Sequence, residues 1–311
     1  MGQKRKNKAL QAHLSLLSAE LFWGLMAPIG KQAMLHGIDD ITLVSFRVAG
    51  AAILFWITSI FVRERIPWKH VVYLGAAALL AVVFNQCLFT IGLNYTSPIN
   101  SSIVTTSLPV FAMILSFIIL KEPITWMKAG GVVIGCAGAI VLILSSAQSG
   151  GKAGNIWGDI MCLCAQISFA LYLTLFNPLI KKYNVVTVNK WMFTWSTIFI
   201  LPFTTGHLSQ VAWTDITSAT WMEAGFVVIF GTYLSYMLAV VGQRVLRPTV
   251  VSVYNYVQPI VSVIVSVAAG IAVFTGRHAI AVILVFTGVR MVIKSKSKND
   301  IKKSTQSVAS K

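Results

Sequence analysis

Three of the charged side chains inside long apolar segments are candidates for a functional role, because a charge there needs a functional or a structural reason. They are Glu20, Lys31 and Arg47. A charge at the centre of a membrane-spanning helix costs on the order of 2.5–3.5 kcal/mol on the insertion scale, and it usually faces a cavity or a partner. Lys31 and Arg47 lie on either side of one short turn, so together they could form a cationic pocket for a carboxylate. The pattern therefore predicts a small-molecule substrate that is anionic or zwitterionic.

Each of these charges also has a structural explanation. Lys31 could extend its amine to the membrane surface. Arg47 could form a structural ion pair with Glu20, or with Asp39 or Asp40. Glu20 is in addition a candidate for carrying a coupling proton, with uniport as the alternative.

Amide and aromatic side chains inside apolar segments supply the second set of candidates. Ser252, Asn255 and Gln258 follow one another at three-residue steps, which places them on one face of a helix. The other candidates for substrate binding are Trp23, Asn85, Gln86, Asn100 and Tyr254. The alternative for the amides is that they only join helices to one another through hydrogen bonds.

Motifs typical of catalysis, cofactor binding and nucleic-acid binding are missing from the sequence. We find no HExxH, no GxSxG and no phosphate-binding glycine loop, and the four cysteines lack metal-ligand spacing. The basic residues form short clusters between apolar segments rather than one basic face. We therefore expect no enzyme, no cofactor, no metal and no nucleic-acid partner.

The composition indicates that these residues are positioned by membrane-spanning helices. The chain has 311 residues, of which 56% are hydrophobic and 11% charged, and its mean hydropathy is +0.77. A spanning helix needs about 20 apolar residues. Segments of this kind occur at about 13–35, 40–62, 70–93, 97–120, 125–145, 155–180, 186–205, 219–243, 248–271 and 276–294. The sequence thus predicts an all-α, polytopic membrane protein with ten transmembrane helices in a lipid bilayer.

The distribution of basic residues predicts the orientation. With the N-terminus in the cytoplasm, twenty of the 25 lysines and arginines fall in cytoplasmic loops or tails. An even number of spans then places the C-terminus on the same side. We expect a multi-pass protein of the cell (inner) membrane with both termini cytoplasmic.

Two pairs of prolines reveal an internal repeat. Pro98 and Pro109 recur as Pro248 and Pro259, an offset of 150, and an offset of 146 aligns Glu20 with Gln166. Because each half holds five predicted spans, an odd number, the second half must enter the membrane inverted. We divide the chain into a basic cytoplasmic N-terminus (1–12), a first five-helix repeat (13–145), a linker (146–154), a second five-helix repeat (155–294) and a basic cytoplasmic tail (295–311). Inverted repeats are typical of secondary transporters, whose substrate site lies near the midplane where the repeats meet.

The sequence also resembles a known family. The segments ELFWGLMAPIGK (20–31) and TSPINSSIVTTSLPVFAMILSFIILKEPITW (96–126), with Arg47 and the weaker copy after Pro248, are similar to the EamA-like branch of the drug/metabolite transporter superfamily. The resemblance implies a ten-helix carrier that exports amino acids or related small metabolites by alternating access, without ATP or a prosthetic group. The alternatives are an efflux carrier for drugs or toxic compounds, and then a membrane-embedded enzyme or a channel.

Overall fold

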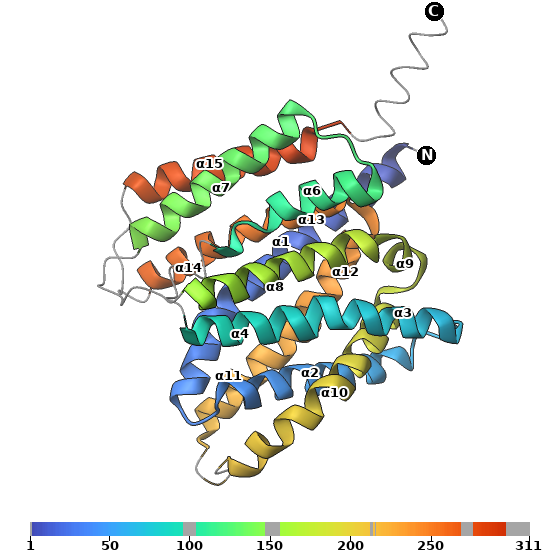
Figure 1. Cartoon of the computed structure of the whole chain (residues 1–311), viewed down its shortest axis with the longest axis vertical. Helices are drawn as coiled ribbons and strands as arrows, with labels where there is room; N and C mark the ends of the chain where they lie inside the picture. The colour runs from blue at the N-terminus through green and yellow to red at the C-terminus, as the bar shows by residue number, and fades with distance from the viewer. Residues whose placement is uncertain are drawn as a thin grey trace, which may run out of the picture.

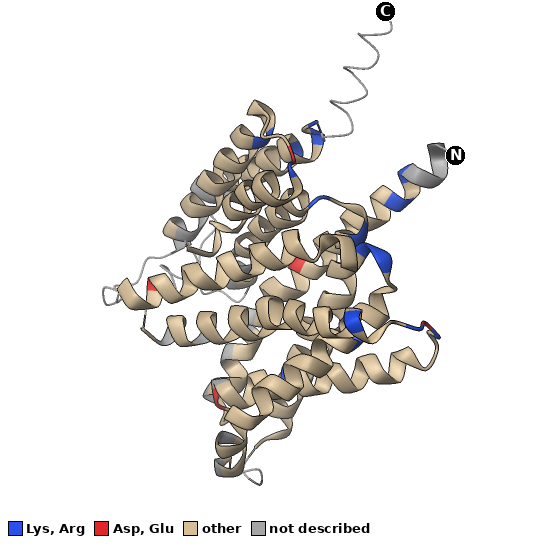
Figure 2. Cartoon of the chain, turned by 45° about the vertical axis from the view of Figure 1, so that its right-hand side comes forward, with Lys and Arg blue, Asp and Glu red and all other residues tan. Residues whose placement is uncertain are grey.

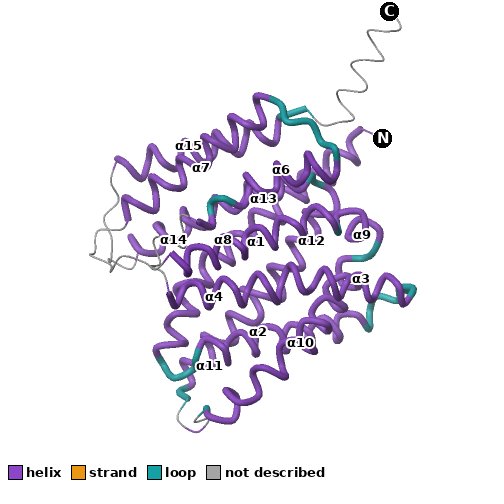
Figure 3. Tube along the Cα trace, viewed as in Figure 1, coloured by secondary structure: helices purple, strands orange, loops and turns teal. Residues whose placement is uncertain are grey.

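The computed structural model describes residues 2–95, 104–146, 156–211, 214, 216–268 and 276–296. Within these ranges the chain is helical and contains no strand (Figure 3). Figure 1 shows the long helices lying side by side, with the α7 and α15 pair at one edge and α2, α10 and α11 at the other. The architecture agrees with the predicted all-α fold.

The first half of the chain contains five helical stretches. Their elements are α1 (Gly2–Leu35), α2 (Asp40–Ser59), α3 (Trp68–Ala78) with η1 (Leu79–Phe84) and α4 (Asn85–Tyr95), α6 (Leu108–Leu120) and α7 (Trp126–Ser146). Gly37 lies in the turn between α1 and α2. Its φ angle is 107°, which glycine adopts without a steric cost. Asp39 then caps α2, because its side chain accepts a 2.9 Å hydrogen bond from the Thr42 backbone N–H.

The second half follows the same plan. Its elements are α8 (Ile156–Leu175), the short α9 (Asn177–Lys182), α10 (Val185–Gln210), α11 (Ser218–Val228) with η3 (Ile229–Leu234) and α12 (Ser235–Val245), α13 (Pro248–Val253) with η4 (Tyr254–Tyr256) and α14 (Val257–Ala268), and α15 (Gly276–Lys294).

Helix occupies the described part of every predicted span, with shifted boundaries. α1 begins at Gly2 rather than at 13, so the basic N-terminal segment continues the helix, and α2 ends at Ser59 rather than at 62. By length and composition, four described helices could cross a membrane, namely Ile41–Ser59, Trp68–Phe89, Ile156–Leu175 and Ser218–Val245. The total of ten spans stays a prediction.

The internal repeat is visible in the helix boundaries. Each boundary of α3, η1 and α4 recurs 150 positions later in α11, η3 and α12, as from Leu79–Phe84 to Ile229–Leu234. η1 and η3 are π-helical turns, which are rare and often lie at functional sites. The offset of 150 predicted from the prolines therefore also relates η1 and η3, which the sequence analysis did not predict. We call η1 and η3 the wide turns.

The packing of helices follows the same symmetry. α7 packs on α15 and α2 packs on α10, and in each pair a helix meets its own counterpart from the other half. The contact of α4 with α8 is matched by that of α12 with α1, and α6 with α8 is matched by α14 with α1. Figure 1 shows α7 ending and α15 beginning at the same end of the bundle, so counterparts run in opposite directions. The two halves are inverted repeats.

Glycines allow the closest of these contacts. A Cβ atom added to Gly92 on α4 would lie 2.8 Å from Cys162 Sγ on α8, and one added to Gly242 on α12 would collide with Leu16 on α1. Both positions need glycine because a neighbouring helix passes directly over them. The equivalence of Leu16 and Cys162 supports the offset of 146 for α1 and α8.

Basic residues gather at one end of the helices. Figure 2 shows most of the described lysines and arginines at the end of the bundle where α1 begins and α15 ends. This distribution has the asymmetry that the positive-inside rule requires.

Candidate functional site

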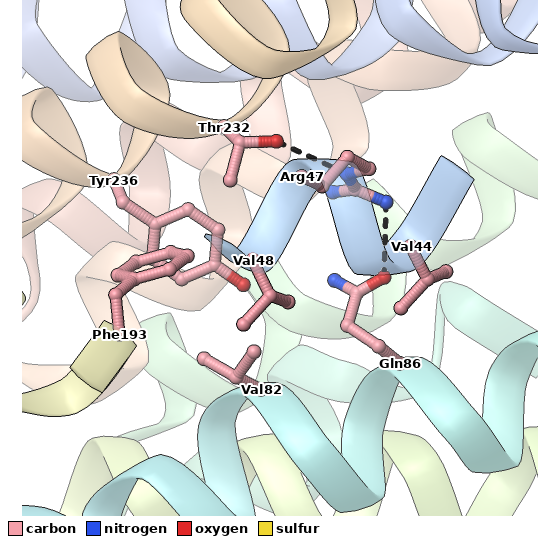
Figure 4. A pocket seen from close by; sticks show the side chains of 8 residues that line it. All are labelled: Val44, Arg47, Val48, Val82, Gln86, Phe193, Thr232 and Tyr236. Carbon is pink, nitrogen blue, oxygen red and sulfur yellow. Dashed lines mark hydrogen bonds between the residues drawn. The ribbon is translucent and has the colours of Figure 1, made fainter. Parts of the chain in front are cut away.

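Arg47 lies on α2 between the two halves of the molecule. Its Nε donates a 3.0 Å hydrogen bond to Thr232 Oγ1 in η3, and its Nη1 donates a 3.2 Å bond to Gln86 Oε1, two residues after η1 (Figure 4). The guanidinium thus joins the two wide turns. Both of these partners are neutral.

A small cavity adjoins the guanidinium group of Arg47. It is lined by Val44, Arg47, Val48, Val82, Gln86, Phe193, Thr232 and Tyr236 (Figure 4). Val82 and Thr232 are equivalent positions of the repeat, and so are Gln86 and Tyr236. The cavity therefore lies where the repeats meet. In the part of the chain that the structure describes, this cavity has room for about one water molecule.

Hydroxyl groups satisfy backbone carbonyls at the wide turns. Thr232 Oγ1 donates to the Val227 carbonyl oxygen at 2.9 Å, and Ser235 Oγ donates to that of Phe230 at 2.7 Å, both five residues earlier. At the equivalent place in the first half, Ser168 Oγ of α8 donates to the Leu80 carbonyl oxygen at 2.8 Å. These bonds stabilise turns that would otherwise leave polar groups unpaired in an apolar environment.

A second polar cluster joins α1 to α14. Gln258 Nε2 donates to Glu20 Oε2 at 2.7 Å and to Asn255 Oδ1 at 2.8 Å. Asn255 Nδ2 in turn donates to the Thr105 carbonyl oxygen at 3.3 Å. Asn255 and Thr105 are equivalent positions of the repeat, so this cluster also lies between the two halves. Glu20 is buried, with 4% of its surface exposed.

Two predicted aromatic residues lie beside this cluster. The Trp23 ring, one turn after Glu20, meets the ring of Tyr236 edge-on at 5.5 Å between centroids. Since Tyr236 lines the Arg47 cavity, Trp23 connects the two polar sites. The hydroxyl of Tyr254 is 2.8 Å from His13 Nδ1, so this pair adds a second polar contact between α1 and the segment that precedes α14.

The remaining predicted residues are not brought to either cluster. Asn85 Nδ2 donates to the Ala165 carbonyl oxygen at 3.0 Å and joins α4 to α8, and Ser252 Oγ donates to the Thr249 carbonyl oxygen of its own helix. A role of these two residues in substrate binding stays a prediction. Asn100 and the side chain of Lys31 lie outside the described residues.

The structure separates Glu20 from Arg47. Glu20 is bonded to Gln258 and Arg47 to Thr232 and Gln86, and the described residues form no Glu20–Arg47 ion pair. Thr232 and Tyr236 were missed by the sequence analysis. The repeat could have indicated Tyr236, because it stands 150 positions after the candidate Gln86.

Comparisons with known proteins agree with this architecture. The model of the EamA-like transporter family matches residues 10–144 and again residues 156–294. The chain is 30% identical over 182 residues to an uncharacterized transporter of Archaeoglobus fulgidus, covering 58% of this chain and 63% of the relative. It is 23% identical to the uncharacterized transporter YyaM of Bacillus subtilis, over 89% of this chain and 92% of YyaM. A solved crystal structure superposes with a TM-score of 0.73 at 17% identity, covering 91% of this chain and 99% of the other.

Proposed function

Because the chain belongs to the EamA-like transporter family, we propose that it is a secondary-active carrier for small metabolites that bear a carboxylate, such as amino acids. Transport proceeds by alternating access, with the two repeats moving about a site between them. Export as the net direction follows from the family resemblance. Efflux of drugs or toxic compounds is the alternative within the same class of protein, and catalysis or channel conduction are the alternatives outside it.

The observation that carries the carboxylate proposal is the environment of Arg47. A guanidinium group has five N–H donors in a fixed fork, and the structure gives Arg47 two bonds, both to neutral oxygens. Burying a cation beside neutral groups is costly unless an anion compensates it. A substrate carboxylate that accepts two parallel hydrogen bonds from this fork would supply that compensation.

The cavity beside Arg47 has room for about one water molecule, and an amino acid is far larger. In this proposal the helices around Arg47 separate when substrate binds. Lys31 stays a predicted second cation of this subsite. Glu20 is the candidate for a coupling proton and uniport is the alternative, and transport with and without an imposed pH gradient distinguishes the two.

The test is transport by the purified full chain in proteoliposomes. We would measure counterflow of amino acids against their amides, in the wild-type chain and in Arg47→Lys. The lysine keeps the charge but loses the two-donor fork, so we expect transport of free acids to fall by about tenfold or more. Arg290→Lys on α15 is the matched control, because Arg290 is exposed and distant from the cavity residues in the sequence.

The opposite result is equally clear. If the wild-type chain moves amides as readily as free acids, and Arg47→Lys and Lys31→Gln both stay active, then the cations are structural and the carboxylate proposal is wrong.

A further inference from the structure

The amide group of Gln258 has an unusual position in the α1–α14 interface. Its Nε2 lies between two oxygens, 2.7 Å from Glu20 Oε2 and 2.8 Å from Asn255 Oδ1. The bond from Asn255 Nδ2 to the Thr105 carbonyl oxygen turns the Asn255 oxygen towards Gln258. One N–H₂ group therefore serves a carboxylate and an amide oxygen at once.

The charge of this cluster is incomplete. A buried carboxylate is best compensated by a cation, and the described residues give Glu20 only the neutral amide of Gln258. An ammonium group donates hydrogen bonds to a carboxylate at about 2.7–2.9 Å, which matches the two distances made by Nε2. The two distances fit an amide and an ammonium group equally, and the negative charge of the carboxylate suits the ammonium group better.

We propose that Glu20 and Asn255 form a binding subsite for the protonated amine of the substrate, and that Gln258 fills this subsite when the carrier is empty. The proposal rests on the carrier function proposed above and narrows its substrates to compounds with both a carboxylate and a primary amine. Entry of the amine displaces the Gln258 amide and breaks its bond to Glu20. Because that bond joins α1 to α14, substrate binding loosens a contact between the two halves.

The surroundings of the cluster support a link to the Arg47 cavity. Trp23 follows Glu20 by one turn of α1 and meets Tyr236, which lines that cavity. The helix that carries Glu20 of the amine subsite therefore also contacts an aromatic residue that lines the carboxylate subsite.

A metal ion suits this place less well. The Gln258 nitrogen marks a point 2.7 and 2.8 Å from its two oxygens, which is longer than the 2.3–2.6 Å typical of calcium and the 2.0–2.1 Å typical of magnesium. The described residues also contain no group of three or more His, Cys, Asp or Glu side chains that could hold a metal.

The first experiment needs no knowledge of the substrate. The thermal unfolding midpoint of the purified full chain would be measured in methylammonium chloride, sodium chloride and potassium chloride at equal ionic strength. We expect methylammonium to raise the midpoint of the wild-type chain and of the control Glu223→Gln, but not that of Glu20→Gln. An equal effect of sodium would show a metal-cation site instead, and no effect of methylammonium would overturn the proposal.

Gln258→Ala separates this proposal from a purely structural role. Removing the competing amide should lower the methylammonium concentration that gives half of the effect, while the maximal transport rate falls because the closing contact is lost. If Gln258 only joins helices, the variant should lose folded protein and gain no affinity.

Transport then tests the specificity. Alanine and propionate differ only in the amine, and we expect the wild-type chain to prefer the amino acid by about tenfold, the value of one hydrogen bond to a buried charge. Glu20→Gln should lose this preference and still carry propionate. If the wild-type chain carries both compounds without preference, the amine subsite is refuted and the proposed function is not. If it carries neither carboxylate, the proposed function itself is refuted.

Discussion

The interface between α1 and α14 has a counterpart in the interface between α8 and α6, and the two differ in chemistry. Glu20 of the first is replaced by Gln166 in the second, and Gln258 by Leu108, whose side chain is 3% exposed in an apolar cluster. Gly24 is replaced by Ala170, which belongs to the same cluster. One interface carries a buried carboxylate and is closely packed, whereas its counterpart carries the neutral Gln166 beside an apolar cluster.

This difference separates the demands of the fold from those of function. In both interfaces the first helix of one repeat packs on the proline-containing helix of the other repeat. The fold therefore needs this contact twice. It needs the charge in neither, since the α8–α6 interface is built from Leu108, Ala112 and Ala170. Burying a carboxylate that the scaffold does not require costs free energy, which supports the proposal that Glu20 belongs to a binding subsite.

The largest expected effect concerns the orientation of the helices in the membrane. The comparison of the two interfaces depends on it, because the second repeat is inverted relative to the first. The exposed residue Lys182 ends α9, just before α10 begins, and the exposed residue Ser209 lies near the far end of α10. Each would be replaced by cysteine. We expect an impermeant thiol reagent, added outside intact cells, to label Ser209→Cys and not Lys182→Cys. Labelling of Lys182→Cys from outside would reverse the predicted orientation, and labelling of both would remove the span between them.

The next effect is a direct comparison of the two interfaces. Glu20→Ala removes the carboxylate and leaves the Gln258 amide without its charged partner, so we expect transport to fall by about tenfold or more. Gln166→Ala changes the equivalent position and should reduce transport less than about twofold. Rates would be normalised to folded protein in proteoliposomes. Similar losses in both variants would mean that the interfaces are equivalent.

A smaller effect concerns the packing. A Cβ atom at Gly24 would lie 2.7 Å from Val261 Cβ, so Gly24→Ala must push α1 away from α14. Overpacking of this kind costs about 1–3 kcal/mol. Ala170→Gly leaves space in the counterpart and should cost about 1 kcal/mol, mainly from helix propensity. Thermal unfolding measures both, and transport should suffer only in Gly24→Ala.

The smallest effect comes from the contact at the end of the polar interface. Tyr254→Phe removes the hydroxyl 2.8 Å from His13 Nδ1, and a neutral hydrogen bond contributes about 1 kcal/mol to stability. We expect a modest fall in the unfolding midpoint with the substrate preference unchanged. A lost preference for amines would extend the amine subsite to Tyr254.

Much of the fold could be predicted because hydropathy and proline placement report directly on long helices. The spans and the offset of 150 came from such patterns. The wide turns could not be predicted, because LLAVVF and IFGTYL are as suitable for an ordinary helix as for a π-helical turn. A tertiary contact contributes to η1, namely the bond from Ser168 on α8 to the Leu80 carbonyl oxygen, whereas Thr232 and Ser235 make the equivalent bonds at η3 within their own helical stretch.

The candidate residues were easier to find than their partners. A carboxylate, a guanidinium or an amide in an apolar segment is conspicuous, so Glu20, Arg47 and Gln258 were all candidates. The structural alternative that paired Arg47 with Glu20 is not what the described residues form, since Arg47 bonds to Thr232 and Gln86. The true partner of Glu20 is 238 residues away. Thr232 escaped notice because a single hydroxyl in an apolar helix usually bonds to its own backbone.

The matched wide turns also record the history of the chain. A π-helical turn is an α-helix that has gained one residue, and such an insertion disrupts the packing of everything after it. Both halves carry the gain at the same place, Leu79–Phe84 and Ile229–Leu234, although none of the six aligned residues is the same. One insertion in a five-helix ancestor, copied when that ancestor was duplicated, accounts for both. We infer that the widened turn is older than the duplication and outlasted the divergence of the sequence around it.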